Sequence, residues 1–144
     1  MPIWKGFLMV VSTPTQSHIL VIDHSPDVIN VLRELLSDEG YRVSTGLHLS
    51  HDARSVVESA PDLIVIDYVW ETPDENWSLL QSIRRMPPAR DIPIVLCTGS
   101  VRQATGMADH LRSLQIDVVL KPFDIDRFLA VVSAALSRKK SRPA

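Results

Sequence analysis

The chain lacks several features that mark common classes of protein. It has one cysteine, Cys97, among 144 residues, so it cannot form an internal disulfide, which fits a reducing compartment and a cytoplasmic location. It has no excess of positive charge, because its formal net charge is −2, and this gives no reason to expect nucleic acid as a partner. No apolar run approaches the roughly 20 residues that span a membrane, so we expect no membrane partner either.

What remains is the composition of a folded domain. Hydrophobic residues make up 45% and charged residues 22% of the chain, values that argue against disorder. A length of 144 residues suits one domain with its own core. We expect this domain over residues 17–138, with a loosely ordered leader over 1–16 and a basic tail over 139–144. The apolar part of the leader is shorter than the stretch of about 7–15 residues that a signal peptide needs.

Short β-branched runs alternate with helical patterns along the chain. Two of the runs, "ILVI" and "LIVI", are apolar at every position, which is typical of parallel strands covered on both faces. The repeated alternation predicts an α/β fold, in which a five-stranded parallel sheet carries helices on both faces. Strands are expected over 18–23, 41–45, 62–69, 92–98 and 117–120, and helices over 25–41, 50–61, 76–86, 104–115 and 124–139.

Capping residues indicate where three of these helices begin or end. Ser25 is the expected N-cap of the first helix, and Gly40 is its expected stop. Ser50 is the expected cap of the second helix. The last helix begins near Asp124 or Asp126, and the sequence leaves this choice open.

Residues that carry ligand-forming or reactive groups follow four of the apolar runs. They are Asp23 after "ILVI", Asp67 after "LIVI", Thr98 after "IVLC" and Lys121 after "VVL". Each residue alone has an ordinary explanation, such as helix capping or a solvated loop. Because the carboxyl ends of parallel strands meet at one edge of an open sheet, the four together predict one site. Two close carboxylates favour Mg²⁺, and an aspartate beside cationic groups suits the formation of an aspartyl phosphate.

These segments resemble the receiver domain of two-component response regulators. The resemblance rests on "ILVIDH", "PDLIVID", "IPIVLCTG" and "VVLKPFD" in this order, and spans about residues 18–137. It implies a flavodoxin-like, doubly wound sheet with strand order 2-1-3-4-5. It also implies that Asp67 is the phosphoacceptor, and that Thr98 and Lys121 contact the phosphoryl group. Asp23, Asp67 and the backbone carbonyl of Val69 are implied as Mg²⁺ ligands, and the bond between Lys121 and the following proline is expected to be cis.

Three features depart from the family pattern. His24 stands where the family has a second acid that binds Mg²⁺ directly, so Mg²⁺ binding is expected to be weak. Two alternatives stay open. His24 either caps the turn and faces solvent, or it acts beside the phosphoryl group. The loop after Asp67 lacks glycine and carries Trp70 and Trp77, which either cover the core or form a partner-binding lid. Val118 replaces an aromatic residue that usually moves with the hydroxyl residue, so the switch is expected to be muted or different.

The resemblance implies a signalling module and not an enzyme. We expect Asp67 to accept a phosphoryl group from a histidine kinase or a phosphotransfer protein. Since no effector domain follows residue 137, output is expected through contact with a downstream effector protein, unless the chain is part of a larger protein; a homodimer is left open. The first alternative is a degenerate receiver that binds its partner without phosphorylation. The second is a hydrolase with Asp67 as nucleophile, which the valine at position 69 disfavours because such enzymes need a nearby acid there.

Overall fold

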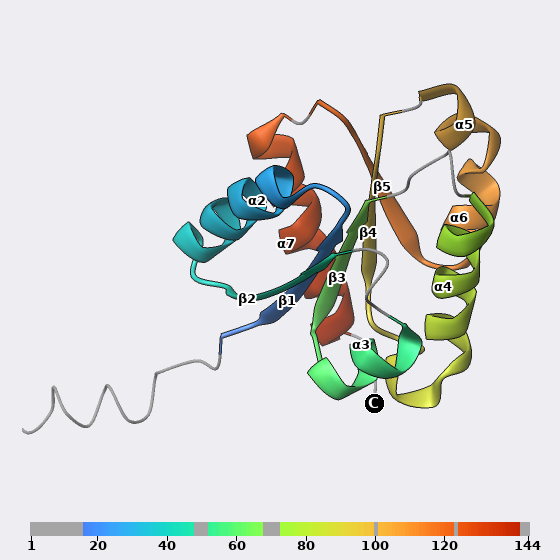
Figure 1. The fold of residues 1–144 in the computed structure, drawn as a ribbon, viewed down its shortest axis with the longest axis horizontal. Coiled ribbons are helices and arrows are strands. Elements are labelled where there is room, and N and C mark those ends of the chain that lie inside the picture. The colour runs from blue at the N-terminus through green and yellow to red at the C-terminus, as the bar shows by residue number, and fades with distance from the viewer. Residues whose placement is uncertain (1–15, 48–51, 68–72, 100, 123, 142–144) are drawn as a thin grey trace, which may run out of the picture.

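A five-stranded parallel sheet forms the centre of the molecule (Figure 1). The structure is a computed structural model that describes residues 16–47, 52–67, 73–99, 101–122 and 124–141. The strand order β2-β1-β3-β4-β5 confirms the predicted fold class and topology. Because the strand order reverses between β1 and β3, the carboxyl ends of these two strands flank the crevice where such sheets bind ligands. The strands are β1 His18–Asp23, β2 Arg42–Leu47, β3 Leu63–Asp67, β4 Ile94–Thr98 and β5 Ile116–Leu120.

Helices cover both faces of this sheet, as the alternation predicted. Helices α2 and α7 lie over one face, and α3, α4, α5 and α6 lie over the other (Figure 1). Their bounds are α2 Pro26–Asp38, α3 Ala53–Ser59, α4 Pro73–Arg85, α5 Val101–Gly106, α6 Ala108–Ser113 and α7 Ile125–Ser141, and a short 3₁₀ helix spans Pro87–Ala89. Among the helices of the described residues, none is both long and apolar enough to cross a membrane.

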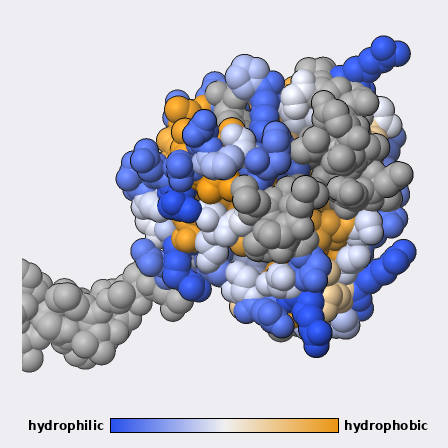
Figure 2. All heavy atoms as spheres, in the orientation of Figure 1, coloured by the Kyte–Doolittle hydropathy of each residue, from blue (hydrophilic) through white to orange (hydrophobic). Residues whose placement is uncertain are grey.

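The apolar runs of the strands feed two separate cores. Successive side chains of a strand point to opposite faces of the sheet. In β1, Ile19 and Val21 pack under α2 and α7, whereas Leu20 and Ile22 pack under α3, α4 and α6. Each of these four side chains is at most 1% exposed, which explains why the run has no polar position. Among the coloured residues of Figure 2, hydrophilic ones lie around the rim of the face, and hydrophobic ones show between them.

The predicted N-cap and the predicted stop of the first helix are both confirmed. The hydroxyl of Ser25 accepts a hydrogen bond from the amide of Val28 at 3.4 Å, so Ser25 is the N-cap of α2. Gly40 follows the C-cap with a φ of +92°, a left-handed conformation that glycine adopts at little cost. The open choice at the last helix is also decided, because the Asp124 carboxylate accepts a hydrogen bond from the Arg127 amide at 3.1 Å.

Three other helix predictions are wrong. The stretch 104–115 does not form one helix, because α5 ends at Gly106 and α6 begins at Ala108. Glycine is costly within a helix, so a break at this position is physically reasonable. The cap of α3 is Asp52, whose carboxylate accepts the Ser55 amide at 2.8 Å, and not Ser50, which lies outside the described residues. Helix α4 also begins three positions earlier than predicted, at Pro73, a residue suited to the first helical turn.

Candidate functional site

The carboxyl edge of the sheet brings together the four residues that the sequence singled out. Asp23 ends β1, Asp67 ends β3, Thr98 ends β4, and Lys121 directly follows β5. The two aspartates are 1% and 3% exposed and Thr98 is fully buried, whereas the lysine is half-buried. Buried carboxylates need partners, because an isolated charge in the interior is costly. The contacts of these two aspartates therefore define what the site is able to do.

Lys121 joins the two carboxylates. Its Nζ donates to Asp67 Oδ1 at 2.7 Å and lies 3.4 Å from Asp23 Oδ2. Burial alone lowers the pKa of this ammonium group, but the hydrogen bond and charge of Asp67, with the charge of Asp23, outweigh burial and raise it. Lys121 therefore carries its positive charge at neutral pH. The peptide bond to Pro122 is cis, as predicted, and the Lys121 amide donates to the Thr98 carbonyl at 2.8 Å.

His24 occupies the opposite side of the same two carboxylates. Its Nδ1 contacts Asp67 Oδ2 directly and lies 3.5 Å from Asp23 Oδ1. The imidazole is nevertheless 58% exposed, so it forms the outer wall of the site. The turn itself is held by Asp23, whose Oδ1 accepts the Ser25 amide at 2.9 Å. This arrangement favours a role for His24 in the site over a histidine that only caps the turn.

The Ser25 amide is a contribution that the sequence reasoning did not assign to the site. By donating to Asp23 Oδ1, it fixes the orientation of a carboxylate that also faces Lys121 and His24. The sequence carries a signal for this contact, because an aspartate commonly accepts a hydrogen bond from the amide two residues later in a turn. The same serine therefore caps α2 with its side chain and positions Asp23 with its backbone.

The donor atoms on the His24 side form a candidate metal site. Asp23, His24 and Asp67 each offer one ligand atom, and these three atoms lie within 4.8 Å of one another. Two carboxylate oxygens suit Mg²⁺, but an imidazole nitrogen does not, since Mg²⁺ strongly prefers oxygen ligands. The donor set as a whole therefore does not fit Mg²⁺ well. The predicted backbone ligand, Val69, lies outside the described residues, as does Trp70.

Two further residues near the site have defined surroundings. Val118 is half-buried and packs against the core cluster under α3, α4 and α6, so its side chain fills an interior position of β5. Cys97, which pairs with Asp67 across β3 and β4, is 1% exposed. Burial raises the pKa of its thiol to about 12, so the group is protonated at neutral pH and is a poor nucleophile there.

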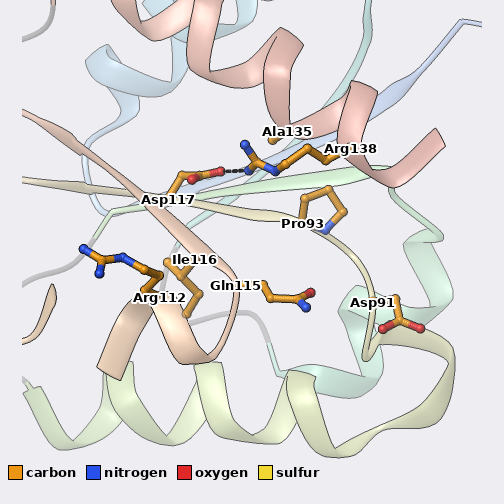
Figure 3. Close-up of a pocket in the computed structure, with 8 residues that line it drawn as sticks. All are labelled: Asp91, Pro93, Arg112, Gln115, Ile116, Asp117, Ala135 and Arg138. Carbon is orange, nitrogen blue, oxygen red and sulfur yellow. Dashed lines mark hydrogen bonds and ion pairs between the residues drawn. The ribbon is translucent and has the colours of Figure 1, made fainter. Parts of the chain in front are cut away.

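A hollow lies at the end of the sheet away from the candidate site. Its cavity is about 310 Å³, and Figure 3 shows its lining near the amino ends of β4 and β5. Arg138 of α7 forms an ion pair with Asp117 across it, while Asp91, Pro93 and Gln115 line its side. Because the acidic cluster stands at the carboxyl ends of the strands, this hollow is separate from the candidate site.

Comparison with known proteins agrees with this geometry. Residues 19–133 match the family model described as "Response regulator receiver domain". The chain is similar to the nitrogen assimilation regulatory protein NtrX of Azorhizobium caulinodans, with 29% identity over 126 residues, 86% of this chain and 27% of that protein. It is also similar to the transcriptional regulatory protein PrrA of Mycobacterium tuberculosis, with 31% identity over 130 residues, 88% of this chain and 53% of that protein.

A solved structure shows the same fold. The chemotaxis response regulator CheY4 of Vibrio cholerae superimposes with a TM-score of 0.69 at 18% identity, covering 84% of this chain and 99% of that one. At this identity the likeness speaks for the fold alone. The chain spans between 27% and 53% of the length of the two regulators above, so what those whole proteins do does not transfer to it directly.

Proposed function

The chain belongs to the response regulator receiver domain family, and on this premise we propose that it accepts a phosphoryl group on Asp67 as a module of a two-component phosphorelay. The observation that carries the proposal is the position of this carboxylate. Asp67 ends the central strand β3, is 3% exposed, and has one oxygen held by Lys121 Nζ at 2.7 Å. A buried carboxylate needs a cation wherever it lies, so the lysine contact alone does not assign a function. The place of this pair at the ligand-binding edge of the sheet is what supports the proposal.

The proposed chemistry is transfer from a phosphohistidine of a histidine kinase or a phosphotransfer protein. An Asp67 carboxylate oxygen attacks phosphorus, the new O–P bond forms as the P–N bond breaks, and the electron pair returns to the donor imidazole. Lys121 offsets the negative charge that gathers on the phosphoryl oxygens. The bond between the Lys121 amide and the Thr98 carbonyl ties the ends of β4 and β5 together, so the two switch positions are coupled through the backbone.

The output is proposed to pass through contact with a downstream effector protein. Thr98 and Lys121 lie at the ends of β4 and β5, beside the loops that lead to α5 and α7. A phosphoryl group that draws these residues toward itself would shift those loops. Val118 lacks an aromatic ring that would follow, so we propose that the shift is carried by the backbone of β4 and β5.

The test is covalent phosphorylation followed by intact mass measurement. Incubation with a small phosphodonor and a divalent cation is expected to add one phosphoryl group to the wild-type protein. The D67N variant keeps the size of the side chain, loses the nucleophilic carboxylate, and is expected to show no gain. No gain in the wild type with any divalent cation, or an equal gain in D67N, would contradict the proposal.

One observation favours a second candidate, a receiver that binds its partner without phosphorylation. Both oxygens of Asp67 are occupied, one by Lys121 and the other by His24. In this reading the cluster is a fixed structural element that holds the carboxyl edge in one state. Equal partner affinity for the wild type, for D67N and for protein treated with a phosphodonor would support it.

A further inference from the structure

We propose that the Asp23–His24–Asp67 cluster binds a borderline divalent metal ion, such as Co²⁺ or Zn²⁺, through a mixed nitrogen and oxygen ligand set in which His24 Nδ1 is a ligand. The inference goes beyond the proposed function, because metal binding to the cluster does not require phosphoryl transfer. It shares Asp67 and its lysine partner, Lys121, with that proposal. It rests on the geometry of the cluster and on the mismatch between an imidazole ligand and Mg²⁺.

Each of the two aspartates has one carboxylate oxygen on the Lys121 side of the cluster and the other on the His24 side. Lys121 Nζ takes Asp67 Oδ1 at 2.7 Å and faces Asp23 Oδ2 at 3.4 Å. The remaining oxygens, Asp23 Oδ1 and Asp67 Oδ2, face His24 Nδ1. One ligand atom from each of the three residues lies within 4.8 Å of the other two. The side away from the lysine therefore presents one nitrogen and two oxygens, of which Asp67 Oδ2 contacts His24 and Asp23 Oδ1 also accepts the Ser25 amide. No other such group of three occurs among the described residues.

The reduced charge of this set weakens the binding of any divalent ion, and its donor type disfavours Mg²⁺ in particular. Two carboxylates and one ammonium group leave a single negative charge, whereas an acid in place of His24 would leave two. Mg²⁺ gives up its water reluctantly and takes oxygen ligands in a near-ideal octahedron. Co²⁺, Ni²⁺ and Zn²⁺ accept imidazole readily. An imidazole in the third position therefore shifts the preference of the site from a hard ion toward a borderline one.

Two of the proposed ligands are buried and held in place, whereas the third is exposed to solvent. Asp23 and Asp67 are 1% and 3% exposed, and the Ser25 amide and Lys121 hold them in place. The His24 side chain is 58% exposed and stands between these oxygens and solvent. Entry of an ion requires this side chain to turn away from Asp67 Oδ2, after which its nitrogen completes the ligand set.

Tighter binding of Co²⁺ than of Mg²⁺ would not alone establish this role. Divalent ions late in the first transition row bind most protein sites more tightly, even sites made of oxygen alone. The informative quantity is the ratio of the Mg²⁺ and Co²⁺ dissociation constants. This ratio is compared between the wild type and a variant in which only the ligand at position 24 differs. H24N removes the imidazole nitrogen, supplies an amide oxygen and adds no charge. H110Q, on the exposed histidine of α6, is the matched control.

The experiment is calorimetric titration of the full 144-residue protein with CoCl₂ and, separately, MgCl₂, together with the visible absorption of the Co²⁺-bound form. H24N is expected to weaken Co²⁺ binding at least about tenfold, the lower end of what loss of even an outer-shell partner costs. Its Mg²⁺ affinity is expected to be unchanged or slightly higher, and the Co²⁺ absorption bands are expected to shift. H110Q is expected to behave as the wild type.

An unchanged ratio and unchanged Co²⁺ bands in H24N would overturn the proposal. So would Co²⁺ binding that survives in a D23N/D67N double variant, because the ion would then sit elsewhere on the chain. These outcomes are separate from phosphorylation. A wild-type protein that binds Co²⁺ through His24 but gains no phosphoryl group would sustain this inference and contradict the proposed function, and the opposite pair of results would do the reverse.

Discussion

Asp67 is held between two nitrogen groups of different character. On one side Lys121 supplies a fixed positive charge at 2.7 Å, and on the other the exposed imidazole of His24 makes direct contact. The lysine contact joins β3 to the residue after β5, whereas the histidine contact joins it to the turn after β1. The same carboxylate thus connects three strands at the edge of the sheet, and its environment depends on residues far apart in the sequence.

Replacement of Lys121 is expected to destabilise the fold in a pH-dependent way. K121M leaves two buried carboxylates without their cation. The free energy of unfolding is expected to fall by about 1–3 kcal/mol, which is less than the cost of breaking a fully buried ion pair because the lysine is half-buried. The folded state raises the lysine pKa above 10.5, so its contribution is complete below pH 10.5 and is lost as pH rises through the folded value. Urea unfolding at pH 7.5 and at more alkaline pH measures this.

K121R is the matched control for that change. Its guanidinium keeps a positive charge at every pH of the experiment. The stability of K121R is therefore expected to lack the alkaline loss assigned to the Lys121 ammonium group. A difference between wild type and K121M that stays constant with pH would show that the lysine acts through packing and not through charge.

The thiol of Cys97 is expected to be inert in the folded protein. Its pKa is raised to about 12, mainly by burial, from an ordinary value of 9.0. The unfolded state therefore loses this proton at lower pH than the folded state, so the group lowers stability as pH rises from about 9 to about 12. At pH 8 a thiol reagent is expected to label the protein only in denaturant. Rapid labelling of the native protein would contradict the burial of this residue.

The sequence predicted which residues meet at the site, but not how they contact one another. Each of four apolar strands is followed by or ends in a reactive residue, and the parallel topology brings these strand ends to one edge of the sheet. The sequence therefore predicted that four residues lie together, namely Asp23, Asp67, Thr98 and Lys121. The contact between His24 and Asp67 spans 43 positions in the sequence. The direction of an exposed imidazole depends on the relative placement of two strand ends, which no local pattern specifies.

At the level of the elements, the fold depends on contacts that helix patterns do not reveal. The guanidinium of Arg84, near the end of α4, donates to backbone carbonyls of two separate loops. Its Nη1 lies 2.7 Å from the Ile92 carbonyl, and its Nε lies 2.9 Å from the Leu114 carbonyl. Further carbonyls at up to 3.5 Å belong to Ala89, Arg90 and Gln115. Arg84 thereby ties α4 to the segments that lead into β4 and β5.

The variant R84K is expected to lose most of this connection. A lysine keeps the charge but lacks the planar fork that reaches both loops at once. Because hydrogen bonds to charged groups contribute about 1.5–3 kcal/mol each, and one lysine amine replaces several of them only in part, the free energy of unfolding is expected to fall by about 1–3 kcal/mol. R85K, on the adjacent and exposed arginine, is the control and is expected to change stability little. Equal stability of the two variants would contradict the assigned role.

Helix boundaries show where sequence patterns fail and why. The strands and the first helix were predictable because long apolar runs and a Ser-Pro start have few competing explanations. Helix α4 begins at Pro73, earlier than its apolar pattern suggested, and the predicted helix over 104–115 divides at Met107. Apolar periodicity marks the buried face of a helix and not its ends, so polar first turns and short breaks were missed.

For the whole molecule, the sheet is the scaffold that couples the site to the surface. Every strand lies parallel to its neighbours, so the edge that holds Asp67 also carries the loops that precede α2, α5 and α7. The two cores fix the sheet from both faces. Among the described residues, the buried polar side chains Asp23, Asp67 and Thr98 lie at its carboxyl edge, whereas buried His18 begins β1 at the other end. A change in charge at Asp67 is therefore expected to shift the backbone of β4 and β5 first, through Thr98 and Lys121.

Amide spectra recorded with and without a phosphoryl mimic test this claim most directly. Beryllium trifluoride bound to a carboxylate imitates an aspartyl phosphate, and ¹H–¹⁵N spectra of the labelled protein report each backbone amide. With Mg²⁺ or Zn²⁺ present, shift changes are expected to centre on residues 67, 98 and 121 and to extend along β4 and β5, and D67N is expected to show none of them. Spectra that do not change with either ion, or that change equally in D67N, would contradict the account.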